Sequence, residues 1–156
     1  MKQRIFYTIL FLVLNFTALG IGVYLMDGGP LSDWYIQLNQ APWTPPNPTF
    51  GIAWSIIMIC FAFYMSNLIL KNSNRNTIWI IYIIQWILNT GWNYTFFNQH
   101  LPILGLINLL ILFGTVSYLL FNFSNTLKRS TYLILPYILW LIVAISLNSY
   151  IVIYNN

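Results

Sequence analysis

Charged residues are scarce in this sequence. Of 156 residues, two are acidic and six are Lys or Arg, so 5% of the chain is charged, whereas a soluble domain has about 25% because its surface must be hydrated. None of these charges lies inside the five long apolar stretches of the chain. The composition therefore excludes an ordinary soluble domain. It also argues against active transport that relies on a carboxylate buried in the membrane.

Cysteine and histidine are almost absent as well. Cys60 and His100 are the single residues of their types. One cysteine excludes an intramolecular disulfide, and one cysteine with one histidine argues against a metal site built by the protein. The sequence also contains no nucleophile–base motif of a hydrolase and no internal repeat of the kind found in inverted-repeat transporters. We expect no metal and no obligatory cofactor.

What the sequence does contain is apolar length, since 59% of its residues are hydrophobic. Each stretch of about 20 apolar residues can cross a bilayer as a helix, and near-continuous hydrophobicity argues against a barrel. The prediction is an all-α membrane protein, a five transmembrane helix bundle that forms a single domain over residues 1–156. The predicted helices span residues 5–26, 50–70, 78–97, 101–121 and 132–154.

The cations are sorted in a way that predicts the orientation of the chain. They form three pairs, Lys2/Arg4, Lys71/Arg75 and Lys128/Arg129, which five crossings place on one face, while Asp27 and Asp33 fall on the other. The positive-inside rule puts the cationic face in the cytoplasm. We therefore expect a bacterial inner-membrane protein with its N-terminus cytoplasmic and its C-terminus outside. The three pairs form no basic stripe, so membrane lipids rather than nucleic acid are the expected partners.

The outer segment 27–49 is unusual for a loop because it combines prolines with aromatic residues. Trp34, Tyr35 and Trp43 stand among Pro30, Pro42, Pro45, Pro46 and Pro48. Flexible linkers are polar and rich in Gly and Ser, whereas this segment is stiff and apolar. It is predicted to fold over the mouth of the bundle as an ordered cap. The alternative is an aromatic anchor that rests in the lipid headgroups.

Uncharged amides are the polar residues within the predicted helices. Gln85, Asn89 and Asn93 follow one another at intervals of four and so lie near one face of their helix. Asn15, Asn108 and Asn148 add one amide to each of three other helices. Such amides either hydrogen-bond neighbouring helices together or converge on a cavity where they orient a ligand among aromatic rings.

Three motifs, in order along nearly the whole chain, resemble those of the TspO/MBR family. The first comprises Trp34-Tyr35, Leu38, Trp43-Thr44-Pro45-Pro46, Gly51 and Trp54. The second is Gln85-Trp86-Ile87-Leu88-Asn89-Thr90-Gly91-Trp92 with Phe96-Phe97. The third is Pro136-Tyr137, Trp140, Ala144 and Leu147-Asn148. The chain departs from the family pattern at Gln40, where a cation commonly stands, and at Asn108, where an acid is common. No cation follows Tyr150 or Tyr154, so the proposed cholesterol pattern is incomplete.

The resemblance implies a five-helix bundle, commonly a homodimer, whose cavity binds porphyrins such as protoporphyrin IX, haem and related flat hydrophobic ligands. Carried over by motif, the ligand-binding residues are Tyr35, Trp43, Pro45, Trp54, Asn89, Trp92, Trp140, Ala144 and Asn148. A receptor, sensor or transporter for tetrapyrroles is the leading hypothesis. One alternative is light-dependent oxidative degradation of bound porphyrin, with Trp54 and Trp140 as candidate redox residues. Another is a structural or regulatory membrane subunit.

Overall fold

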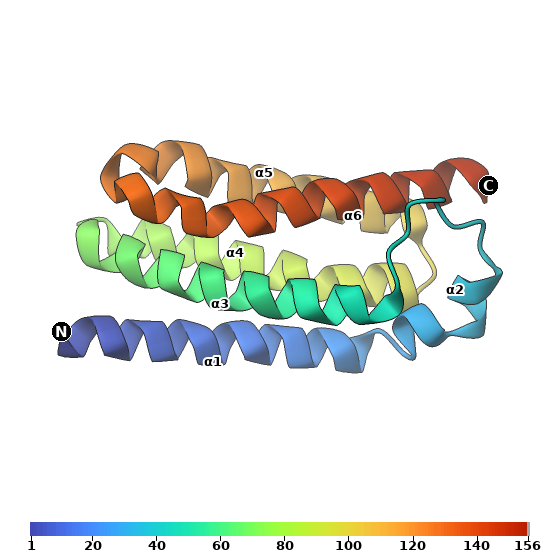
Figure 1. The fold of residues 1–156 in the computed structure, drawn as a ribbon, viewed down its shortest axis with the longest axis horizontal. Coiled ribbons are helices and arrows are strands. Elements are labelled where there is room, and N and C mark those ends of the chain that lie inside the picture. Colours follow the sequence, from blue (N-terminus) through green and yellow to red (C-terminus); the bar gives the residue numbers. More distant parts are fainter. Residues whose placement is uncertain (156) are drawn as a thin grey trace.

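Helices account for nearly all of the chain, and five long ones lie side by side (Figure 1). The computed structural model describes residues 1–155, in which no strand occurs, and the all-α prediction is confirmed. Asn156, the last residue of the predicted domain, lies outside the described residues. In chain order the elements are α1 (Lys2–Leu25), the 3₁₀ turn η1 (Gly29–Leu31), α2 (Asp33–Gln37), α3 (Asn47–Lys71), α4 (Arg75–Asn93), the π turn η2 (Tyr94–Asn98), α5 (Pro102–Leu127), the 3₁₀ segment η3 (Lys128–Ile134) and α6 (Leu135–Tyr154).

Three stretches within residues 1–155 are long and apolar enough to cross a membrane. They are Lys2–Leu31, Asn47–Lys71 and Pro102–Tyr154, the last of which contains both α5 and α6. The helix α4 is not among them, because the amides Gln85, Asn89 and Asn93 lower its hydropathy. The length and hydropathy of these stretches are typical of a membrane protein.

The charged residues are divided between the two ends of the bundle. The N-terminus, the turn from α3 to α4 and the segment from α5 to α6 lie at one end, and with them lie all three cationic pairs (Figure 1). The short helix α2, which carries Asp33, and the end of α6 lie at the opposite end. This is the arrangement that the positive-inside rule requires of a bundle that crosses a bilayer.

Proline begins three of the long helices. Pro48, Pro102 and Pro136 occupy the first turn of α3, α5 and α6. A backbone N–H in a first turn has no intrahelical acceptor, so proline removes no hydrogen bond there. Pro136 therefore starts α6 and does not kink it.

Three of the intramembrane amides, apart from Asn148, join helices together. Asn15 of α1 donates to the Met58 carbonyl of α3 (2.9 Å) and accepts from the Tyr82 hydroxyl of α4 (2.7 Å). Gln85 of α4 donates to the Tyr137 hydroxyl of α6 (2.7 Å), and Asn108 of α5 donates to the Leu88 carbonyl (3.1 Å). For these residues the first of the two interpretations, hydrogen bonding between helices, holds.

Candidate functional site

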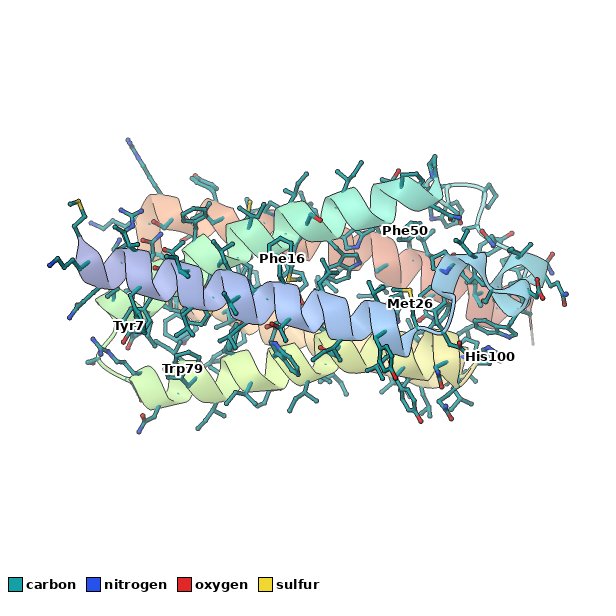
Figure 2. The ribbon with its side chains drawn as sticks, turned by 90° about the horizontal axis from the view of Figure 1, so that it is seen from below. Tyr7, Phe16, Met26, Phe50, Trp79 and His100 are labelled. Atoms are coloured by element: carbon teal, nitrogen blue, oxygen red, sulfur yellow. The ribbon has the colours of Figure 1, made fainter. Side chains whose placement is uncertain are left out.

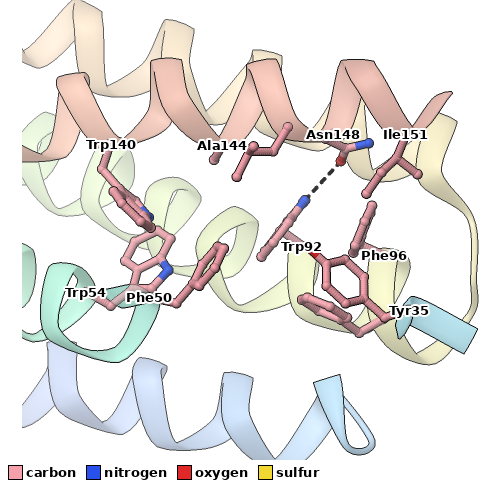
Figure 3. A pocket seen from close by; sticks show the side chains of 11 residues that line it. Tyr35, Phe50, Trp54, Trp92, Phe96, Trp140, Ala144, Asn148 and Ile151 are labelled. Atoms are coloured by element: carbon pink, nitrogen blue, oxygen red, sulfur yellow. Dashed lines mark hydrogen bonds between the residues drawn. The ribbon is translucent and has the colours of Figure 1, made fainter. Parts of the chain in front are cut away.

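A cavity lies between α3, α4 and α6 at the end of the bundle that carries α2 (Figure 3), with about 390 Å³ of empty space when its open mouth is included. Each of the three helices contributes one indole. The residues that line it are Tyr35, Phe50, Trp54, Trp92, Phe96, Phe97, Trp140, Ala144, Leu147, Asn148 and Ile151.

The aromatic rings of this cavity are held by contacts with one another. Trp54 meets Tyr137 edge to face at 5.8 Å, and Phe50 meets Trp140 in the same way at 5.6 Å. Trp92 stacks on Phe96 at 5.3 Å. Since such pairs fix ring orientation as well as burying apolar area, the cavity has preset aromatic faces on which a flat ligand can stack.

Asn148 sets the position of the central indole. Its side-chain oxygen accepts a hydrogen bond from Trp92 Nε1 (3.3 Å), drawn as a dashed line in Figure 3, and its Nδ2 donates to the Pro102 carbonyl (2.9 Å). The Asn148 side chain is 1% exposed. Its oxygen lies so close to Gly105 of α5 that a Cβ there would be 3.1 Å away. This amide thus joins α4, α5 and α6 and also lines the cavity.

The π turn η2 presents two phenylalanines to the site. The backbone N–H of Gln99 bonds the Tyr94 carbonyl five residues earlier (3.0 Å), which widens the last turn of this helical segment. Phe96 and Phe97 of this turn are both buried, and they meet edge to face at 4.8 Å. Wide turns of this kind occur often at functional sites.

The cap, residues 27–49, closes the cavity through Tyr35. Ser32 begins α2 by accepting from the Tyr35 backbone N–H (3.3 Å), and Gln40 Nε2 donates to the Tyr35 carbonyl (3.0 Å). The Tyr35 ring packs against Phe97 at 5.3 Å and is 5% exposed. Burial raises the pKa of the Tyr35 phenol, so the hydroxyl is neutral at physiological pH and is available as a donor to a ligand.

Further contacts attach the cap to α6 and to the start of α5. Asn39 and Asn155 exchange hydrogen bonds: the Asn39 N–H donates to Asn155 Oδ1 (2.7 Å), and Asn155 Nδ2 donates to the Asn39 carbonyl (3.1 Å). Trp43 Nε1 donates to the Ser146 hydroxyl (3.2 Å). Trp34 stacks on His100 at 4.3 Å.

A second cavity lies beside the first between α1, α3 and α4, with about 570 Å³ of empty space when its open mouth is included. Four aromatic residues line both cavities and form the partition between them: Phe50, Trp54, Trp92 and Phe97. The other residues of the second cavity are Ala18, Leu19, Val23, Met26, Pro30, Gly51, Asn89 and Asn93. Asn89 and Asn93 of α4 therefore line the second cavity, whereas Asn148 of α6 lines the first.

The model of the TspO/MBR family matches residues 10–154, a range that includes every residue lining the two cavities. The chain belongs to the TspO/MBR family. The resemblance carried by the three sequence motifs is confirmed.

The curated proteins that are similar to this chain include two named TspO and one named CrtK. The tryptophan-rich protein TspO of Chlorobaculum tepidum is 28% identical over 134 residues, which cover 84% of this chain and 85% of that protein. The tryptophan-rich protein TspO of Bacillus cereus is 31% identical, with 69% of this chain and 71% of that protein covered. Protein CrtK of Rhodobacter capsulatus is also 31% identical, with 74% of each chain covered.

The TspO/MBR motif residues do not all lie at one site. Six of the nine predicted ligand-binding residues line the first cavity: Tyr35, Trp54, Trp92, Trp140, Ala144 and Asn148. Both candidate redox tryptophans are in this group. Asn89 lines the second cavity, on the other side of the partition. Trp43 is 55% exposed and packs outside, against Ser146 and Tyr150 of α6. Pro45 lies in the connection between α2 and α3 and is in neither set of lining residues.

Five lining residues of the first cavity were not predicted as ligand-binding: Phe50, Phe96, Phe97, Leu147 and Ile151. Helical spacing could have identified most of them. Phe50 precedes Trp54 by four residues, and Phe96 follows Trp92 by four. Leu147 and Ile151 follow Ala144 by three and seven. Residues at these intervals share a helix face, so a face that carries one lining residue predicts the others.

Proposed function

We propose that this member of the TspO/MBR family is a membrane receptor or transporter that binds a porphyrin, such as protoporphyrin IX or haem, in the first cavity. One observation carries the proposal. Three helices each contribute an indole to a single cavity, and a buried tyrosine of the cap closes it. A flat aromatic ligand gains both apolar burial and stacking on such rings.

The polar groups of the cavity support the same ligand class. Asn148 and the neutral Tyr35 hydroxyl stand at the end near the cap, whereas Trp54 and Trp140 lie deeper (Figure 3). A porphyrin has a flat apolar ring and a polar edge with two carboxylates. In the proposed complex the ring stacks on the indoles, and the carboxylates of the polar edge stay hydrated at the cap, because the lining of the first cavity contains no cation.

Titration in the dark tests this proposal. Protoporphyrin IX is added to the protein in lipid nanodiscs while Trp fluorescence is followed. We expect saturable quenching in the micromolar range, where binding free energies are about −8 kcal/mol. In Trp140→Ala the affinity should fall about tenfold or more, because truncating a buried aromatic contact removes well over 1.4 kcal/mol. Linear quenching that is equal in both proteins would mean that porphyrin only partitions into the bilayer, and the proposal would be wrong.

We also propose that the five long helices cross a bacterial inner membrane, with the cationic end of the bundle in the cytoplasm. Single cysteines introduced in a Cys60→Ser background at Ser73, in the turn from α3 to α4, and at Asn47, at the start of α3, test the orientation. Both residues are exposed and lie at opposite ends of α3. A membrane-impermeant maleimide added to intact cells should label the cysteine at 47 and leave the one at 73 unmodified. The reverse pattern would invert the proposed topology.

A further inference from the structure

The second cavity opens sideways between α1 and α3. Val23 of α1 is 57% exposed and Gly51 of α3 is exposed, and both line the cavity. Met26 and Pro30 close it toward the end of the bundle. Figure 2 shows α1 and α3 spreading apart toward the end that carries Met26 and Phe50. The opening therefore lies on the side of the bundle.

The surface around this opening is apolar. Ile21 on α1 and Ile52 and Ile56 on α3 are exposed by 37%, 62% and 50%. In a chain that spans a bilayer, exposed apolar side chains on the long helices face lipid. The opening thus connects the second cavity with the hydrocarbon region of the membrane.

Two amides at the inner side of this cavity lack good partners. The Asn89 side chain is 6% exposed, and within residues 1–155 it makes no hydrogen bond. Asn93 Nδ2 has only the Asn89 carbonyl of its own helix, at 3.5 Å, which is the limit of a hydrogen bond. In contrast, Asn15, Asn108 and Asn148 each donate to a carbonyl of another helix. Because buried amides are nearly always satisfied, Asn89, which faces this cavity, points to a ligand with hydrogen-bonding groups, and the half-buried Asn93 beside it can bond the same ligand.

The lining also restricts the charge and shape of that ligand. It contains no Asp, Glu, Lys, Arg or His, so a charged head would be desolvated without an opposite charge, which is costly. The cavity is apolar except for the two amides and opens toward lipid. A neutral head with donors and acceptors, attached to one alkyl chain that leaves through the opening, satisfies these conditions.

We propose that the second cavity binds a neutral, single-chain membrane amphiphile of the monoacylglycerol class. Its hydroxyl and ester groups bond Asn89 and Asn93, and its chain passes between α1 and α3. Since the cap is attached to α6 and to the start of α5, the lipid enters without opening the cap. This proposal goes beyond porphyrin binding and does not depend on it.

Photocrosslinking tests the proposal. The protein is placed in phosphatidylcholine nanodiscs that contain a monoacylglycerol with a diazirine in its alkyl chain, and the crosslinked peptides are mapped by mass spectrometry. We expect crosslinks at residues 18–26 and 50–54. Unlabelled monooleoylglycerol should compete, and additional phosphatidylcholine should not.

Two glycines provide a matched pair of variants. A Cβ at Gly51 or at Gly114 would have no atom within 4 Å, and leucine is a better helix former than glycine, so both Gly→Leu changes are compatible with folding. Gly51→Leu fills the opening and should abolish the competed crosslinks. Gly114→Leu, on an exposed face of α5, should leave them unchanged. In Asn89→Leu, about tenfold more unlabelled monooleoylglycerol should be needed to suppress the crosslinks, because a hydrogen bond to the lipid head is lost.

Crosslinks spread around the whole bundle, or unchanged in Gly51→Leu, would identify ordinary annular lipid and overturn the proposal. Crosslinks at the predicted residues that phosphatidylcholine displaces equally well would also overturn it, since the site would then not select a single-chain lipid. All of these measurements are made without porphyrin. A failed porphyrin titration would therefore not contradict the lipid site, and a failed crosslinking experiment would not contradict porphyrin binding in the first cavity.

Discussion

Replacing Asn148 by leucine is expected to weaken porphyrin binding about tenfold or more and to lower stability by about 1–3 kcal/mol. The change keeps the branched shape and the number of side-chain heavy atoms but removes the acceptor of Trp92 Nε1 and the donor to the Pro102 carbonyl. Both groups are then left without these partners in a buried region. The central indole also loses the hydrogen bond that sets its orientation, so one face of the cavity is no longer preset.

Asn108→Leu is the matched control. Asn108 is also an intramembrane amide, and it donates to the Leu88 carbonyl (3.1 Å), but it does not line the first cavity. It should cost about 1 kcal/mol of stability and leave porphyrin affinity unchanged. Thermal unfolding and the fluorescence titration, made on the same preparations, separate the two effects. If both variants lose affinity equally, Asn148 acts through the stability of the bundle and has no specific role at the site.

Gly105→Leu is expected to have the largest effect on stability, a loss of about 3 kcal/mol or more. Gly105 is buried in α5, and a Cβ there would stand 3.1 Å from both Asn148 Oδ1 and the Cβ of Phe96. The Cβ of Phe96 cannot rotate away, since its position is set by the backbone of η2. A leucine must therefore push α5 away from η2 and α6. Porphyrin binding should be lost with it.

Gly114→Leu serves again as the control, because a Cβ at Gly114 has open space and lies in the same helix. The free energy of unfolding of Gly114→Leu should equal that of the parent or exceed it by up to about 1 kcal/mol, because leucine has the higher helix propensity. The melting temperature is compared in detergent at one heating rate, since membrane proteins often unfold irreversibly. Equal melting of Gly105→Leu and the parent would show that α5 is loosely packed at this position.

Helix formation could be predicted well because it depends on features that are local in the chain. Long apolar stretches, prolines at helix starts and the three cationic pairs are all visible in the sequence, and the all-α class follows from them. The residues at which the helices end were harder to predict. The fourth predicted helix stops at residue 121, whereas α5 continues to Leu127. Its last turns contain Asn122, Ser124 and Asn125, which resemble a loop in composition.

The positions of the tryptophans show where sequence reasoning reaches its limit. Trp43 and Trp54 belong to one motif, but only Trp54 lines the first cavity, while Trp43 packs against the outside of α6. The connection between them includes Pro45 and Pro46 and has no regular helix before α3 begins at Asn47. No periodicity relates positions across such an irregular segment, so the side on which Trp43 falls depends on its tertiary contacts.

The sequence by itself determined that this is an all-helical membrane protein of the TspO/MBR family, because apolar length, charge sorting and motif spacing are properties of the linear chain. Only the tertiary structure decided what each amide does. Asn15, Asn89 and Asn148 are the same residue type in similar apolar helices, yet one joins helices, one faces the second cavity without a partner and one positions Trp92. The difference arises from how the helices cross and where they separate, since an amide can bond another helix only where that helix brings a polar group within hydrogen-bonding distance.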